Sequence, residues 1–120
     1  MNIYKSSEDY LERILVLKKE RGKIRSIDLA NSMSFTKASV SIAMKKLKEL
    51  RFIEIDEKGY IELTEHGQII AENIYERHTI LFNFLTKLGV EKNIAYKDAC
   101  KLEHDISDET FEALKKYINE

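Results

Sequence analysis

The sequence of 120 residues contains no proline, only four glycines and a single cysteine. This scarcity of turn-forming residues disfavours a loop-rich or all-β protein and favours helices. One cysteine excludes an intrachain disulfide and suits a reducing compartment. No apolar run approaches the roughly 20 residues that span a bilayer, and the first ten residues lack the apolar stretch of a secretory signal. The sequence therefore predicts a cytoplasmic protein with no membrane partner.

Charge is distributed unevenly along the chain. Hydrophobic residues make up 43% of it, too many for a disordered protein, and the formal net charge is only −1. Residues 21–51 hold eight basic and two acidic residues, whereas residues 52–120 hold eight basic and 15 acidic residues. We interpret the first block as a phosphate-binding surface and the second as a cation-binding or solvated surface.

Helical spacing and capping residues organise the first half of the chain. They predict a helix over residues 6–22 and a short helix capped by Ser26. Small polar residues at 31–34 predict a tight turn, and Thr36 is expected to begin a third, basic helix. Alternating apolar residues over 52–63, interrupted by a turn, predict a β-hairpin. This order is typical of a winged helix-turn-helix, which places its second helix in the major groove of DNA.

Longer helices are expected in the second half. Thr64 is predicted to cap a long helix that ends near Leu88, before Gly89, and shorter helices follow over residues 91–104 and after Ser107. The long helix has an apolar stripe too wide for one small lobe to cover, which predicts a homodimer. The stripe consists of Ile69, Ile70, Ile74, Ile80, Leu81, Phe84, Leu85 and Leu88.

Several side chains of the second half are potential metal ligands. Cys100, Glu103 and His104 stand at positions i, i+3 and i+4, so a helix places them on one face. Thiol, carboxylate and imidazole groups all bind transition metals. Further candidates on other predicted helices are Asp9, Glu12 and His78.

The basic block supplies candidates for DNA contact, and Lys58 in the predicted hairpin turn could reach a neighbouring groove. Most lysines are expected to bind phosphate, whereas Lys37 and the hydroxyl groups at the start of the third helix are better placed to read bases. The candidate residues are Arg25, Ser26, Thr36, Lys37, Ala38, Ser39, Ser41, Lys45, Lys46 and Lys58. The sequence thus predicts a mainly α fold: a winged helix-turn-helix with a small β-hairpin wing over residues 1–66, then an all-helical metal-binding and dimerisation domain over residues 67–120.

Three segments, at residues 7–12, 76–78 and 98–108, resemble the diphtheria toxin repressor family, which includes manganese transport regulators. The resemblance implies a metal-activated repressor that binds a palindromic operator in double-stranded DNA as a homodimer and controls metal-ion homeostasis or uptake genes. It also implies the short, manganese-type architecture, without an SH3-like third domain. The metal ligands that it implies are Asp9, Glu12, His78, Cys100, Glu103 and His104.

The implied ligand set combines two patterns within that family. Asp9 and Glu12 resemble manganese-type members, whereas Cys100 resembles iron-type members. Phe82 and Tyr96 replace further ligands of the family, so we expect one well-formed site in each subunit. Carboxylates suit Mn(II) and a thiolate favours Fe(II), and Zn(II) or Co(II) should also bind in vitro.

Two other interpretations use the same residues. A metal-independent winged-helix regulator would keep the basic helix and give Cys100, Glu103 and His104 structural roles. An enzyme would use Cys100 as nucleophile and His104 as base, but no glycine-rich segment or strand-turn-helix surrounds them to supply an oxyanion hole. The sequence therefore predicts neither catalysis nor a small-molecule substrate.

Overall fold

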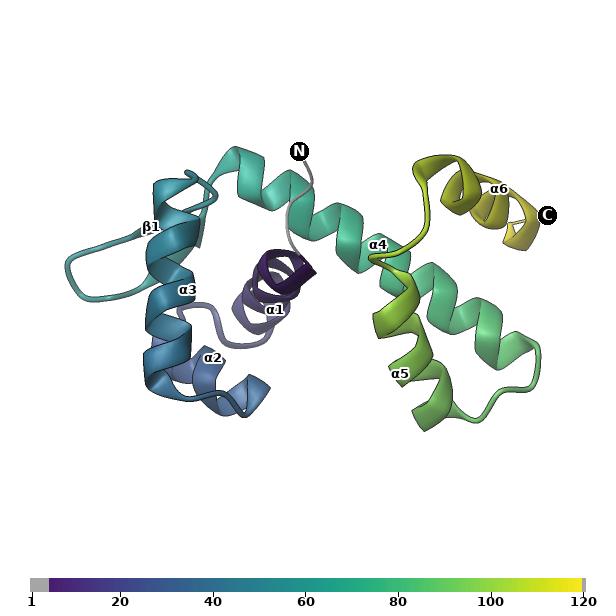
Figure 1. The fold of residues 1–120 in the computed structure, drawn as a ribbon, viewed down its shortest axis with the longest axis horizontal. Coiled ribbons are helices and arrows are strands. Elements are labelled where there is room, and N and C mark those ends of the chain that lie inside the picture. Colours follow the sequence, from purple (N-terminus) through teal and green to yellow (C-terminus); the bar gives the residue numbers. More distant parts are fainter. Residues whose placement is uncertain (1–4, 120) are drawn as a thin grey trace. The chain divides into compact units, whose positions relative to one another are not determined.

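The computed structural model describes residues 5–119 and confirms the mainly helical fold. Within that range the chain forms six helices and one antiparallel hairpin (Figure 1). They are α1 (Lys5–Arg21), α2 (Ser26–Met33), α3 (Lys37–Glu49), β1 (Ile53–Ile55), β2 (Ile61–Leu63), α4 (Glu65–Lys87), α5 (Lys92–Leu102) and α6 (Asp108–Ile118). The chain divides into two compact units, residues 1–72 and 73–120, and α4 contributes to both. No helix in the described range is long and apolar enough to cross a membrane.

The helix-turn-helix of the first unit consists of α2 and α3, and its turn lies later than the sequence suggested. The prediction of a turn at residues 31–34 was wrong, because α2 continues to Met33 and ends at Ser34, whose φ of 59° is left-handed. The predicted Ser26 cap was also wrong. Arg25 precedes the helix, and its backbone N–H donates to the Asp28 carboxylate over 2.8 Å. Thr36, which was expected to begin the third helix, is the N-cap of α3.

The first unit has one continuous apolar core. The inward faces of α1, α2 and α3 meet the hairpin there, and the start of α4 closes the core. Its buried members are Tyr10, Leu11, Ile14, Leu15, Leu17, Ile24, Leu29, Ala30, Val40, Met44, Leu47, Phe52, Ile53, Ile61 and Ala71. Burial of this many large apolar side chains is the main stabilising contribution to the unit.

The hairpin follows the predicted positions. Its register pairs Ile55 with Ile61 and the like-charged Glu54 with Glu62. Lys18 on α1 offsets that repulsion, because its Nζ lies 2.8 Å from the Glu62 carboxylate. The Ile61 N–H also donates to the carbonyl of Ile24, which joins the hairpin to the segment before α2.

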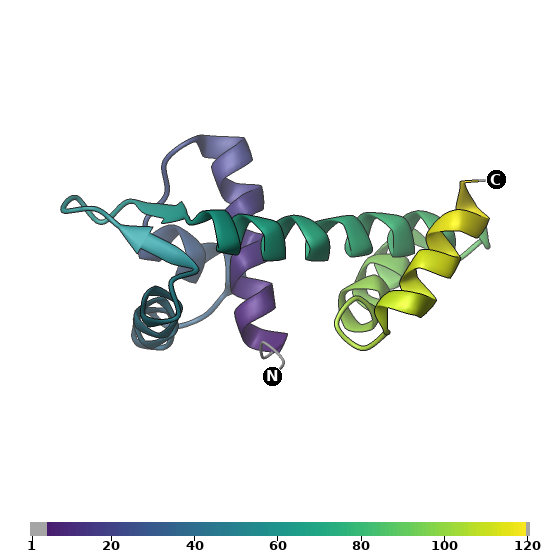
Figure 2. The same cartoon turned by 90° about the horizontal axis from the view of Figure 1, so that it is seen from above.

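The second unit is built on the later part of α4, on which α5 and α6 pack (Figure 2). Gly89, with a φ of 100°, follows α4 and allows the chain to reverse. Glu91 and Ser107 cap α5 and α6 by accepting backbone N–H groups. The second unit has few buried apolar residues: Ile74, Leu81, Ala95, Ala99 and Phe111.

The junction between the hairpin and α4 requires a glycine. Thr64 caps α4, because its hydroxyl accepts the N–H of Gly67 over 3.1 Å. A Cβ atom at Gly67 would lie 2.0 Å from the backbone oxygen of Phe52, which itself accepts the Thr64 N–H. The added Cβ atom would meet only backbone atoms of Phe52, which cannot move aside as the end of a flexible side chain can.

We therefore expect Gly67→Ala to destabilise the chain by about 1–3 kcal/mol or more, the typical cost of overpacking. Chemical denaturation monitored by circular dichroism measures the loss. Asn73→Ala, at an exposed position of the same helix, is the control and should change stability by less than about 0.5 kcal/mol. Equal stability of the two variants would contradict the close approach.

Candidate functional site

Three potential ligands from two helices meet inside the second unit. His78 comes from α4 and Cys100 from α5, and Glu103 stands at the C-terminal end of α5. The Nδ1 atom of His78 lies 3.2 Å from Oε2 of Glu103 and 3.8 Å from Sγ of Cys100. Ligand atoms of the three residues lie within 4.8 Å of one another, close enough to share one cation.

Glu103 is the most deeply buried charged side chain of this group, with 1% of its surface exposed. Its Oε2 atom makes no hydrogen bond of good geometry within residues 5–119. A buried carboxylate oxygen without such a partner is costly unless a positive charge compensates it. Carboxylate, imidazole and sulfur donors converging on one point therefore fit a divalent transition metal.

Histidine protonation supplies a positive charge at this position. Contact with the Cys100 sulfur, and then with the Glu103 carboxylate, raises the pKa of His78 to about 10. His104 lies on the other side of the carboxylate, with its Nε2 atom 3.4 Å from Oε1 of Glu103. Imidazoles therefore approach both oxygens of the Glu103 carboxylate.

Two aromatic rings contact the imidazole of His78. The Tyr96 ring meets the imidazole edge to face at 4.8 Å between centroids, and the Phe82 ring is parallel to it at 6.3 Å. Contacts of this kind limit the orientations of a ring. Phe82 and Tyr96 therefore restrain the imidazole that carries Nδ1.

The predicted ligands divide between the two units. His78, Cys100, Glu103 and His104 belong to the second unit, where the structure brings them together as described. The predicted helix over residues 91–104 is shorter, since α5 ends at Leu102 and His104 lies in the following turn. Asp9 and Glu12 belong to the first unit, at half-buried positions of α1 one turn apart.

Arg77 braces the loop that follows Glu103. Its guanidinium donates to the backbone oxygens of Glu103 over 3.1 Å and of Ile106 over 2.8 Å, and it forms an ion pair with Asp108. The same group lies 5.2 Å from the centroid of the Phe111 ring. One side chain of α4 therefore fixes both the end of α5 and the beginning of α6.

A second candidate surface is the outward face of α3 in the first unit. Val40, Met44 and Leu47 point into the core, with at most 2% of their surface exposed. The exposed positions of α3 and its N-cap carry the predicted DNA-contacting residues Thr36, Lys37, Ala38, Ser39, Ser41, Lys45 and Lys46.

Two hydroxyl groups on that helix already have partners. Thr36 Oγ1 accepts the N–H of Ser39 over 3.1 Å and donates to the Ser39 hydroxyl over 2.9 Å. The capping geometry therefore uses part of their hydrogen-bonding capacity.

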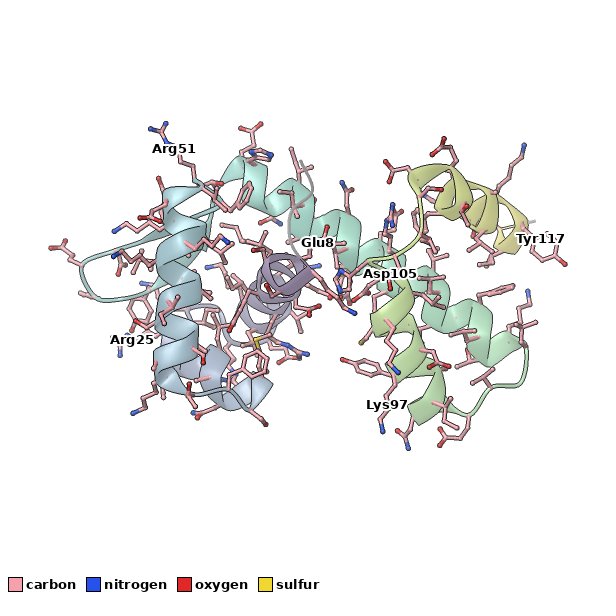
Figure 3. The ribbon with its side chains drawn as sticks, viewed as in Figure 1. Glu8, Arg25, Arg51, Lys97, Asp105 and Tyr117 are labelled. Carbon is pink, nitrogen blue, oxygen red and sulfur yellow. The ribbon has the colours of Figure 1, made fainter. Side chains whose placement is uncertain are left out.

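Basic residues also gather at the turn of the hairpin. The guanidinium carbon of Arg25 lies 4.4 Å from the centroid of the Tyr60 ring, and Lys23 contacts the same ring. Asp56 accepts the N–H groups of Tyr60 and Lys58, and these hydrogen bonds lower the pKa of its carboxyl and fix the turn. In Figure 3 the Arg25 side chain lies beside α3, on the side of the hairpin. Ser26, the remaining candidate, is half-buried in the first turn of α2.

Sequence reasoning did not assign roles to Arg77, Tyr60 or Ile42. Arg77 and Tyr60 act on partners distant in the sequence, so no local signal marks them. For Ile42 the sequence did contain a signal, because its position falls outside the apolar spacing of α3. In the structure 72% of its surface is exposed.

Models of two protein domains match nearly the whole chain. Residues 2–67 match the N-terminal DNA-binding domain of iron-dependent repressors. Residues 64–120 match the metal-binding and dimerisation domain of iron-dependent repressors.

Individual relatives agree with these matches. The chain is 36% identical over 110 residues to the transcriptional regulator MntR of Escherichia coli O157:H7, which covers 92% of this chain and 71% of the relative. It is 37% identical over 115 residues to an uncharacterized HTH-type transcriptional regulator of Methanocaldococcus jannaschii, covering 94% and 92%. The solved structure of the manganese regulator SloR is similar with a TM-score of 0.84 and 33% identity. That match covers 99% of this chain and 55% of the SloR chain, so this chain spans little more than half of that length.

Two ion pairs between α4 and α6 allow a matched test of the Arg77 brace. Arg77→Gln removes donors from two carbonyls in a side chain that is 12% exposed, and we expect it to cost about 1–3 kcal/mol of stability. Lys115→Gln removes the pair with Glu76, whose side chains are 33% and 45% exposed, and should change stability much less, because exposed ion pairs contribute little. Thermal unfolding of the metal-free variants measures both, and an equal loss would show that the loop does not depend on Arg77.

Proposed function

The chain belongs to the family of iron-dependent repressors, and from this membership we propose that it is a metal-dependent DNA-binding transcriptional repressor. The observation that carries the proposal is the buried Glu103 carboxylate, enclosed by His78, Cys100 and His104 in the second unit. The first unit supports the other half of the proposal, because it presents a basic helix opposite its core face.

We assign the metal ligands to both units of the chain. His78, Cys100, Glu103 and His104 would hold the ion from the second unit. The convergence of the first three supports this part, and His104 approaches the other oxygen of Glu103. Asp9 and Glu12 would join them from α1, which rests on the similarity of residues 7–12 to the family. Shared coordination by residues of both units would then couple metal binding to the DNA-binding helix.

A bound divalent cation would supply the positive charge that offsets these carboxylates. The mixture of carboxylate, imidazole and sulfur donors supports Mn(II) or Fe(II) as the physiological ion, and Zn(II) or Co(II) as ions that bind in vitro. The similarity to proteins described as manganese regulators also supports manganese.

On the DNA side, the lysines of α3 would contact phosphates while its first residues meet base edges in the major groove. Lys58 and Arg25 would contact the backbone from the hairpin. We propose that two copies of the chain bind a palindromic operator, since two equivalent recognition helices match two half-sites. Exposed apolar residues of the second unit, among them Leu88 at 65% and Ile94 at 53%, support such a homodimer.

The metal site is tested by calorimetric titration of the anaerobic, metal-free protein with Mn(II) and Fe(II). We expect saturable binding that is strongly weakened in Glu103→Gln and in His104→Ala. The weakening should exceed the roughly 10–100-fold that loss of an outer-shell partner causes, because these side chains would contact the ion directly.

His66→Gln is the matched control for this titration, because His66 lies at an exposed position in the first turn of α4. It should bind both ions as the unmodified chain does. Unchanged affinity in both ligand variants would remove the metal site from the proposal.

Coupling between metal and DNA is tested by fluorescence anisotropy on duplexes selected from a random library by the metal-loaded protein. Addition of a chelator should weaken binding about 5–150-fold, the usual range for linked sites. Metal affinity should rise by the same factor in the presence of DNA, because thermodynamic coupling is reciprocal. DNA binding that a chelator does not change would instead support a metal-independent winged-helix regulator.

A further inference from the structure

The outward face of α3 carries one large apolar side chain, Ile42, with 72% of its surface exposed. Its neighbours Val40 and Met44, two residues away on either side, are buried in the core, so Ile42 lies on the opposite side of the helix. Neither the fold nor helix propensity requires an isoleucine there, since β-branched residues are slightly unfavourable in helices. The exposed side chain is therefore available for a partner.

The surroundings of Ile42 define the chemistry of that partner. Lys45 and Lys46 follow it by three and four residues, and all three are exposed. Ala38, four residues before it, is a second exposed apolar side chain on the same face. A surface that fits this face must be anionic at its edges and carry a small apolar group at its centre.

The major groove of DNA has both properties. Its rims are phosphates, and thymine alone presents a methyl group among the base edges of the groove. We propose that Ile42 is a specificity-determining residue that contacts the 5-methyl group of thymine in the operator. This inference rests on the proposed function and adds a base preference to it.

The test removes the methyl group from the DNA and the side chain from the protein. Duplexes are first selected from a random library by the full, metal-loaded protein. Each thymine of the selected duplex is then replaced by deoxyuridine, which lacks only the 5-methyl group. Binding is measured for the unmodified chain and for Ile42→Ala, whose exposed position leaves the core intact.

We expect deoxyuridine at one or two positions of each half-site to weaken binding by the unmodified chain about fourfold, as expected for one methyl group removed from water. Ile42→Ala should bind the two duplexes equally at those positions. Lys45→Gln is the matched control: it should weaken binding to every duplex but keep the sensitivity to the methyl group.

Other results would overturn the inference. Equal sensitivity of the unmodified chain and Ile42→Ala at every thymine would show that Ile42 does not read the methyl group. Metal-dependent binding without any sensitivity to deoxyuridine would also overturn it, while leaving the proposed function intact. Failure to select any duplex would overturn both, and altered self-association of Ile42→Ala alone would assign the side chain to a protein contact.

Discussion

The second unit depends on one buried carboxylate. Removing Glu103 from water costs several kcal/mol unless positive charge and hydrogen bonds compensate it. Histidines of α4 and of the turn after α5 approach its two oxygens at 3.2 and 3.4 Å, and the first has its pKa raised by the Cys100 sulfur and by the carboxylate itself. A small unit with few fully buried apolar residues thus concentrates its polar groups around one position. Such a group of polar side chains can bind a cation, whereas it could not form part of a hydrophobic core without cost.

The first unit, in contrast, is stabilised mainly by the burial of apolar side chains. A continuous apolar core uses one face of each helix, and the other face of α3 is left for solvent or a partner. Backbone contacts hold the hairpin in place: Ile61 bonds to Ile24, and Gly67 admits α4 close to Phe52. This rigidity matters for DNA recognition, because base contacts require a helix held in a defined orientation.

Local signals predicted most of the elements because each depends on nearby residues. Thr36, Thr64 and Ser107 cap the helices that they were expected to cap, and the hairpin has the expected position. The failures have a tertiary cause. Leu29 and Ala30 are buried in the core, and α2 continues through the polar residues that follow them to a left-handed Ser34. A local preference for a turn was overridden there by packing.

The sequence by itself determined the helix boundaries to within a few residues, the winged-helix order and the ligand-type residues near Glu103. Periodicity and capping are local, so a single chain reveals them. Only the tertiary structure decided that His78 meets Cys100, 22 residues away, that Arg77 braces the loop beyond Glu103, and that Ile42 is left uncovered. Periodicity shows which side chains share a face, but contacts between distant segments decide which face is buried.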